Sequence, residues 1–206
     1  YWWPEEFREN YLVSNKIKDI GDSKQGLATG NNNRFTGKWW EPNVSKISII
    51  ESESDTKIDL DSKWYPYIKG AGGKKWFEPL SDILEYSNNG VALKHCITAR
   101  YGRGATQYFN QGISFSYIGS NGFFSRLRKY KSIFDVSGSS IFTANPKKIQ
   151  VILSSPISGY VIQSINPTIN NQVGDIDYIP IFDRVNNWEN YYNEVKKIYN
   201  SYFSSL

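Results

Sequence analysis

The chain contains one cysteine, Cys96, and one histidine, His95, among 206 residues. A single thiol excludes a disulfide framework and a multi-thiolate metal site, and a single imidazole excludes a multi-histidine metal centre. Without such cross-links the fold must be held by a packed apolar core, and a chain of this length can bury one. The sequence therefore predicts a fold that hydrophobic packing stabilises.

Helices are expected near both ends, with short strands between them. Pro4 and the acids after it predict a helix ending near Asn15, Pro156 begins a second, and the apolar spacing from Trp188 to Phe203 predicts an amphipathic third. We expect strands at 46–51, 91–97, 133–136, 140–142 and 149–153, extended segments at 112–118 and 176–182, a helical turn at 82–85, and loops at 20–30 and through most of 64–78. This pattern predicts an α+β mixed-sheet domain over residues 1–185, with a C-terminal helix over 186–206 that packs on it or leads to the next region.

No apolar run approaches the 18 residues that a membrane-spanning helix needs, and no signal peptide is visible. We therefore expect no membrane partner and a cytoplasmic location. Because the first residue is Tyr1 and not methionine, we interpret the chain as a piece of a longer protein.

Positive charge is concentrated in the middle of the chain. Residues 63–131 hold 11 basic and 3 acidic side chains, whereas residues 1–62 hold 8 and 11, and residues 132–206 hold 5 and 6. Such a basic middle is consistent with a surface that faces phosphates, or with an ordinary solvated face.

The residues give no convincing catalytic or metal site. His95 and Cys96 are neighbours on an expected strand, so their side chains point to opposite faces and do not form a dyad. The glycine-rich segment at 70–73 lacks the spacing of a phosphate loop or a dinucleotide fingerprint. The acids at 51–61 suggest a divalent cation, but the spacing lacks the glycine of a calcium loop and favours a solvated loop.

Aromatic and uncharged residues are interleaved with the central cations. Lys74 and Lys75 precede Trp76, Tyr101 lies between two arginines, and residues 104–125 carry no charge. This pattern suits a nucleic-acid reader, in which cations contact phosphates and amides or hydroxyls reach base edges. An ordinary hairpin with polar loops explains it as well.

Six blocks of sequence, in order, carry a resemblance to one family. Residues 26–35 with Trp39-Trp40-Glu41 resemble "GLxTGxNxRF…W(W/H)E", and residues 64–77 resemble "W(F/Y)PYxKGGxxRKWY". Residues 111–116, 123–126, 134–142 and 166–181 resemble "xGITWS", "GxFSAR", "FDVxGSSxF" and "NPTxNxQVGDIxxLPI". The chain thus resembles the target-recognition region of DNA adenine methyltransferases of the phage-exclusion (BREX) PglX kind, which are related to type IIG restriction–modification enzymes and to the TaqI methyltransferase specificity domain.

The resemblance implies a DNA reader without its catalytic domain. That domain carries an Asn-Pro-Pro-Tyr-like motif, whereas Asn145-Pro146 and Asn166-Pro167 do not continue with Pro-Tyr, and the glycine motif for S-adenosylmethionine is missing. We therefore expect no catalytic residue and no cofactor here, and S-adenosylmethionine as cofactor of a parent adenine-specific methyltransferase in antiviral defence. The implied partners are double-stranded DNA, a catalytic domain in the same parent chain, and other phage-defence subunits.

The loops at 69–75 and 102–116 are the expected contact elements, and Gly72 and Gly73 would allow close backbone approach. Arg34 is expected either to contact phosphate or to hold the fold. The expected DNA contacts are Arg34, Lys69, Lys74, Lys75, Arg100, Arg103, Gln107, Ser114, Arg126 and Arg128.

Two other functions remain open at this point. A glycan-binding module would use Trp39, Trp40, Trp64 and Trp76 as stacking platforms and would be indifferent to salt. A protein-interaction domain would dock an acidic partner that mimics DNA, or another defence subunit, and DNA would compete with it.

Overall fold

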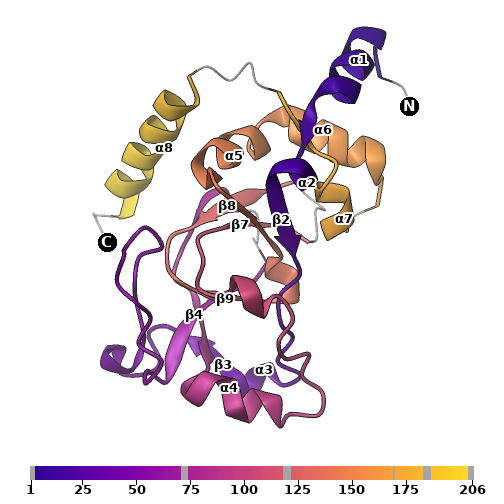
Figure 1. Cartoon of the computed structure of the whole chain (residues 1–206). Coiled ribbons are helices and arrows are strands. Elements are labelled where there is room, and N and C mark those ends of the chain that lie inside the picture. The colour runs from indigo at the N-terminus through magenta and orange to yellow at the C-terminus, as the bar shows by residue number, and fades with distance from the viewer. Residues whose placement is uncertain (1–2, 71–73, 118–121, 169, 183–186, 204–206) are drawn as a thin grey trace.

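The computed structural model describes residues 3–70, 74–117, 122–168, 170–182 and 187–203 and has a mixed α+β architecture, as expected (Figure 1). The described helices are α1 (Glu5–Val13), α2 (Ile17–Ile20), α3 (Asn32–Phe35), α4 (Ser87–Lys94), α5 (Pro146–Leu153), α6 (Pro156–Ile165), α7 (Val173–Ile176) and α8 (Trp188–Phe203), with 3₁₀ turns η1 (Val44–Lys46), η2 (Ala105–Gln107) and η3 (Val136–Gly138). The described strands are β1 (Asn15–Lys16), β2 (Gly21–Lys24), β3 (Thr36–Lys38), β4 (Trp64–Ile68), β5 (Trp76–Glu78), β6 (Asp82–Glu85), β7 (Ile113–Phe115), β8 (Ser125–Arg128), β9 (Ile133–Phe134), β10 (Ser140–Thr143) and β11 (Pro180–Ile181).

Most of these strands form two sheets. One sheet has the order β2-β10-β7-β8-β5 and the other the order β3-β6-β4-β9, while β1 pairs with β11. Both larger sheets are mixed, because β5 runs parallel to β8 and β9 runs parallel to β4, whereas the other pairs are antiparallel. We call them the five-stranded and the four-stranded sheet.

Each larger sheet has its own apolar core. The first core packs the five-stranded sheet against α5, α6, α7 and α8, and Ile113, Phe115 and Ile141 lie in it fully buried. The second core packs the four-stranded sheet against α4 and the loop after it, around Tyr65 and Phe134. Figure 1 shows the larger helices at one end of the molecule, and α3, β3 and α4 at the other.

Helix α8 packs on the rest of the fold. Tyr192 is buried, and its ring lies 5.9 Å from that of Phe77 in β5. The ring of Tyr199 lies 4.7 Å from the same phenylalanine. The amphipathic pattern of this segment therefore predicted its helix correctly. Pro4 and Pro156 likewise predicted the starts of α1 and α6.

Several local predictions are wrong. Residues 149–153 were expected as a strand but belong to α5, because the Asn145 side chain accepts a hydrogen bond from the Lys148 amide at 3.1 Å and Pro146 starts the first turn. Residues 82–85 form strand β6 instead of a helical turn, because β3 and β4 pair with its two edges. Pairing partners distant in sequence decided this second case.

The segments at 91–97, 46–51 and 20–30 also differ. Residues 91–94 form the last part of α4, after a left-handed stretch inside that element at Asn88, Asn89 and Gly90, and asparagine and glycine both tolerate positive φ. The segment at 46–51 makes only isolated bridges, Ile47 to Trp64 and Glu51 to Tyr130. The expected loop at 20–30 begins with strand β2, which pairs with β10. In α6, Val161 is buried as expected, but Ile157 and Tyr160 are each 45% exposed.

Candidate nucleic-acid interface

Three of the sequence blocks meet at the junction between β4 and β9. The Tyr67 hydroxyl donates to Asp135 Oδ2 at 2.7 Å, and the Leu27 amide donates to the Phe134 carbonyl at 3.0 Å. The Val136 amide donates in turn to the Leu27 carbonyl at 3.2 Å. Burial and the Asp135 carboxylate raise the pKa of Tyr67, so this phenol stays a donor. The junction anchors the loops that carry the exposed cations.

Gly26 is required at this junction by close packing. A Cβ atom there would lie 2.0 Å from the Phe134 carbonyl oxygen. No side chain fits at that distance, so the backbone passes the end of β9 only because residue 26 is glycine.

The loop after α4 lies along residues 25–30. The Arg100 amide donates to the Ala28 carbonyl at 2.8 Å, and the Thr98 hydroxyl donates to the Gly30 carbonyl at 3.3 Å. The Arg103 guanidinium donates to the Gln25 carboxamide. These contacts place the exposed Arg100 and Arg103 side chains on loops held to each other by backbone bonds.

Arg34 lies on α3, directly after this segment. Its side chain is exposed and its guanidinium lies 4.9 Å from the Phe35 ring centroid. The Asn31 side chain accepts from the Arg34 amide at 3.1 Å and caps the helix. The Thr98 hydroxyl, and more weakly Arg34, lower the pKa of Cys96, so Arg34 lies near the loop that bears Arg100. The structure thus gathers three of the predicted arginines around residues 25–34.

The predicted lysines lie on the connection from β4 to β5. Lys69 is half-buried, with Nζ 3.7 Å from Asp82 Oδ1 and 3.4 Å from Thr36 Oγ1, which places it beside β3. Lys74 and Lys75 are exposed, and Lys75 Nζ lies 4.8 Å from the Phe124 ring centroid. Gly72 and Gly73, expected to allow close approach, lie outside the described residues.

Gln107 is half-buried at the end of η2. Its Nε2 donates to Asp22 Oδ2 at 3.3 Å, and its Oε1 accepts from Asn110 at 3.0 Å. The carboxamide therefore joins η2 to β2, and it must exchange these partners before it can read a base edge.

Arg126, Arg128 and Ser114 are buried, which corrects their expected role as DNA contacts. Their exposed fractions are 2%, 0% and 0%. The hydroxyl of Ser114 donates to Glu78 Oε2 at 3.0 Å inside the five-stranded sheet. A group without solvent access does not reach a phosphate or a base in this conformation, so these three residues are structural.

Both buried arginines join the two sheets. Arg126 in β8 forms an ion pair with Glu78 of β5 at 2.8 Å, and its Nη2 donates to the Lys69 carbonyl, just after β4, at 2.9 Å. Arg128 Nε donates to Ser132 Oγ at 3.1 Å, just before β9. Each guanidinium therefore spans from the five-stranded sheet to the end of a strand in the other.

Burial dominates the electrostatics of this cluster. It raises the pKa of Glu78 to about 7, and the Arg126 charge and the Ser114 hydroxyl oppose that shift. It also lowers the pKa of both arginines. The Arg128 guanidinium lies 5.0 Å from the Phe134 ring centroid and 5.4 Å from that of Phe142. These aromatic faces replace part of the stabilisation that water would give to the buried positive charge.

The sequence did not reveal that Arg126 and Arg128 join the two sheets. Glu78 is one of only three acids in the basic middle, and an isolated acid among cations is a signal for a specific ion pair. Arg126 was predicted to contact DNA because no local pattern reveals its partner Glu78, 48 residues away.

The lone histidine and cysteine form no metal site with their neighbours. His95 is exposed at the end of α4, and the Cys96 sulfur lies 3.4 Å from the Thr98 hydroxyl. Within the described residues, no three His, Cys, Asp or Glu side chains are grouped to hold a metal ion. In that same part of the chain no helix is long and apolar enough to cross a membrane.

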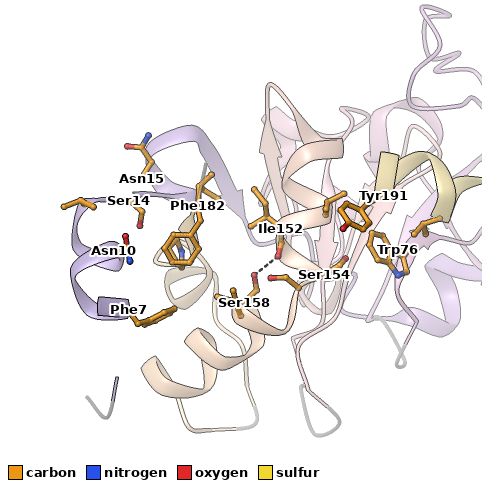
Figure 2. Close-up of a pocket in the computed structure, with 17 residues that line it drawn as sticks. Phe7, Asn10, Ser14, Asn15, Trp76, Ile152, Ser154, Ser158, Phe182 and Tyr191 are labelled. Atoms are coloured by element: carbon orange, nitrogen blue, oxygen red, sulfur yellow. Dashed lines mark hydrogen bonds between the residues drawn. The ribbon is translucent and has the colours of Figure 1, made fainter. Parts of the chain in front are cut away.

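An apolar cavity lies at the other end of the molecule, among α1, α5, α6, β11 and α8 (Figure 2). It measures about 820 Å³, and Phe7, Trp76, Phe182 and Tyr191 contribute its aromatic surface. The described residues that line it include no charged side chain. This cavity therefore offers no acid or base for catalysis and no cation for a phosphate.

Comparison with characterised proteins finds that most of this chain is similar to a segment of two adenine-specific methyltransferases. The chain is 26% identical over 191 residues to the adenine-specific methyltransferase PglX of Lacticaseibacillus casei (strain Zhang), and 28% identical over 188 residues to the adenine-specific methyltransferase BrxX of Escherichia coli O9:H4 (strain HS). The chain is homologous to a segment of these methyltransferases. The matches cover 88% of this chain but only 16% of PglX and 15% of BrxX, so the chain corresponds to a small part of each relative. No family model matches it.

Proposed function

We propose that this chain is the DNA target-recognition region of an adenine-specific DNA methyltransferase of phage defence. The observation that carries the proposal is the homology to PglX and BrxX over 88% of the chain and about a sixth of their length. A segment of this size without a catalytic motif is compatible with the part of such an enzyme that selects the site. The parent enzyme would bind S-adenosylmethionine elsewhere in its chain.

The exposed cations support this proposal. Arg34 lies in the segment 25–34, and Arg100 and Arg103 lie on the loop beside that segment. Lys74 and Lys75 lie on the connection that follows β4, at the same junction. Guanidinium and ammonium groups on loops attached to a braced scaffold suit phosphate contacts, which fix register on a duplex. In this proposal residues 1–185 form the recognition domain, and the helix at 186–206 packs on it.

The division between phosphate and base contacts follows from burial. The exposed arginines and lysines would bind phosphates, whereas the half-buried Lys69 and Gln107 would contact bases only after leaving their present partners, Asp82 and Asp22. Arg126, Arg128 and Ser114 would act indirectly, by fixing the two sheets that carry the loops.

Binding of the 206-residue chain to a fluorescent 30-base-pair duplex tests the proposal. We expect the anisotropy to show binding at low salt, with an association constant that falls steeply as salt rises, because cations displace counterions from the phosphates. Substituting Lys74, Lys75, Arg100 and Arg103 together by glutamine should weaken binding. It should also make the slope of the logarithm of the association constant against the logarithm of the salt concentration, which we call the salt slope, smaller in magnitude by as much as about four.

A matched variant controls for the loss of net charge. Arg8, Lys18, Lys57 and Lys197 are also exposed and lie on α1, on α2, in the segment before β4, and on α8. Replacing these four by glutamine should leave most of the affinity and of the salt slope. Equal effects of the two variants, or no binding to any duplex at low salt, would refute the proposed surface.

A second experiment tests the absence of catalysis. The 206-residue chain with S-adenosylmethionine and genomic DNA should transfer no methyl group to adenine. Robust transfer by this chain alone would contradict the proposal that it is a reader.

A further inference from the structure

A rigid turn after β3 displays two tryptophans to solvent. Trp39 is 40% exposed and Trp40 is 62% exposed, and their rings meet edge to face with centroids 6.0 Å apart. Tryptophan is usually well buried, so two adjacent exposed indoles are unusual for a surface turn. They need an explanation beyond the packing of this domain.

The turn is braced from both sides. The Glu41 amide donates to the Lys38 carbonyl at 3.0 Å, and Glu41 Oε2 accepts from the Lys38 amide at 2.7 Å. The Trp39 amide donates to the Ser81 carbonyl at 3.2 Å, which ties the turn to the start of β6. The backbone under the indoles is therefore ordered before any partner arrives, which lowers the entropic cost of binding.

The tryptophans stand at the same end of the four-stranded sheet as the lysine-bearing connection. In the register of that sheet, Lys38 of β3 and Tyr67 of β4 both face Asp82 of β6. Lys38 Nζ lies 2.9 Å from Asp82 Oδ1 and Lys69 Nζ lies 3.7 Å from the same oxygen. The turn therefore adjoins the start of the loop that leads to Lys74.

Near the indoles lie the ammonium groups of Lys38 and Lys69 and the carboxylates of Asp82 and Glu41, so these charges balance one another. The Asp82 carboxylate faces two ammonium groups, and the Glu41 carboxylate is engaged by the Lys38 amide. Lys46, close in sequence, is exposed. A polyanion can thus approach the turn. The apolar faces of the indoles suit contact with bases and not with phosphates.

We propose that the Trp39–Trp40 turn is a base-stacking wedge, in which an indole inserts at an unstacked step of the bound duplex. This inference rests on the proposed function and adds the residues that contact bases in a sequence-tolerant way. Apolar wedges at base steps unstack and bend DNA, and an aromatic ring can stack on any base. An enzyme that modifies adenine must also take that base out of the stack, and a wedge beside it lowers the cost of doing so.

The test compares two duplexes of one sequence, one fully paired and one with a single mismatch. Mismatched bases cost less to unstack, so a wedge makes the wild-type chain bind the mismatched duplex more tightly. We expect the double variant Trp39→Ala/Trp40→Ala to lose this preference and to bind the mismatched duplex about five- to one-hundredfold more weakly. Its salt slope should stay unchanged, because no phosphate contact is lost.

Two further variants separate stacking from other effects. Trp39→Phe/Trp40→Phe keeps aromatic faces and should restore most of the mismatch preference. Tyr191→Ala removes an aromatic ring that is 59% exposed on α8 and should change neither affinity nor preference. Circular dichroism of each variant checks that the fold is intact.

The possible results distinguish this inference from the proposed function. If the wild-type chain binds neither duplex at low salt, both are wrong. If it binds both duplexes, and the alanine variant shows the same affinities and preference, the wedge is wrong and the recognition role stands.

Discussion

Arg126 and Glu78 form a buried ion pair that also reaches across the two sheets. Arg126 Nη1 lies 2.8 Å from Glu78 Oε2, and Nη2 donates to the Lys69 carbonyl at the end of β4. The pair therefore connects the interior of the five-stranded sheet to the base of a loop proposed to face DNA. Stability and the placement of that loop are coupled through one guanidinium.

Removal of Arg126 should destabilise the domain strongly at neutral and alkaline pH. Arg126→Met leaves the Glu78 carboxylate buried without its partner, and breaking such a pair costs about 3–5 kcal/mol. Urea denaturation at pH 8 measures the loss. The double variant Arg126→Met/Glu78→Leu removes both charges and should recover most of it. A loss below about 1 kcal/mol in the single variant would show that the pair is not important for stability.

The stability of the wild-type chain should fall, through Glu78, as the pH rises toward neutrality. Burial raises the pKa of this carboxyl to about 7 in the folded state, whereas an unfolded glutamate titrates near 4.5. Between these values the folded state binds more protons than the unfolded state, so the free energy of unfolding decreases with rising pH, by up to about 3 kcal/mol. Denaturation at pH 5 and pH 7.5 measures it.

Glu78→Gln provides the control for that pH dependence. Glutamine resembles the protonated acid, so this variant should match the wild type below pH 4.5 and lack the Glu78 contribution to the slope above it. An identical slope in the two proteins would assign the pH dependence to other groups.

Gly26→Ala should disrupt the junction between β4 and β9. The added methyl would lie 2.0 Å from the Phe134 carbonyl oxygen, so the backbone must shift, at a cost of about 1–3 kcal/mol or more. Gly159→Ala is the matched control, because a Cβ there meets nothing within 4 Å and alanine favours the helix of α6. In thermal denaturation, Gly26→Ala should have a lower midpoint than the wild type, and Gly159→Ala should have an equal or higher one. Equal midpoints would contradict the close packing.

Tyr192→Ala should detach α8 from the fold. The Tyr192 ring is buried against Phe77, and truncating a buried aromatic costs about 3–5 kcal/mol. Tyr191→Ala, on the exposed side of the same helix, should cost far less. Limited proteolysis measures the release of α8 as faster cleavage of the chain beyond residue 187. Equal protection of the two variants would show that other contacts hold this helix.

Much of the helical structure was readable in the sequence. The apolar spacing from Trp188 to Phe203, Pro4 at the N-cap of α1 and Pro156 in the first turn of α6 act within one or two turns of helix, so their effect does not depend on distant residues. The residues at 149–153 were assigned to a strand although Asn145 and Pro146 mark a helix start. That signal was local, and the mostly apolar segment Ile149–Leu153, interrupted only by Gln150, concealed it.

The candidate site was less predictable than the helices. Arg34, Arg100 and Arg103 are exposed, whereas Arg126 and Arg128 are buried. The charge pattern of the sequence did not separate these two groups. Burial of a guanidinium requires an acid, a carbonyl or an aromatic face at the right place, and these partners come from β5, from the end of β4 and from the segment before β9.

The amino-acid sequence by itself determined the α+β character, the terminal helices and the positive charge of the central segment, because periodicity, caps and composition are local properties. The tertiary structure decided which cations face solvent and which join the two sheets. The physical reason is desolvation: a charge enters the interior only where other groups compensate it, and Arg126 acquires its partner Glu78 only once β8 and β5 have paired.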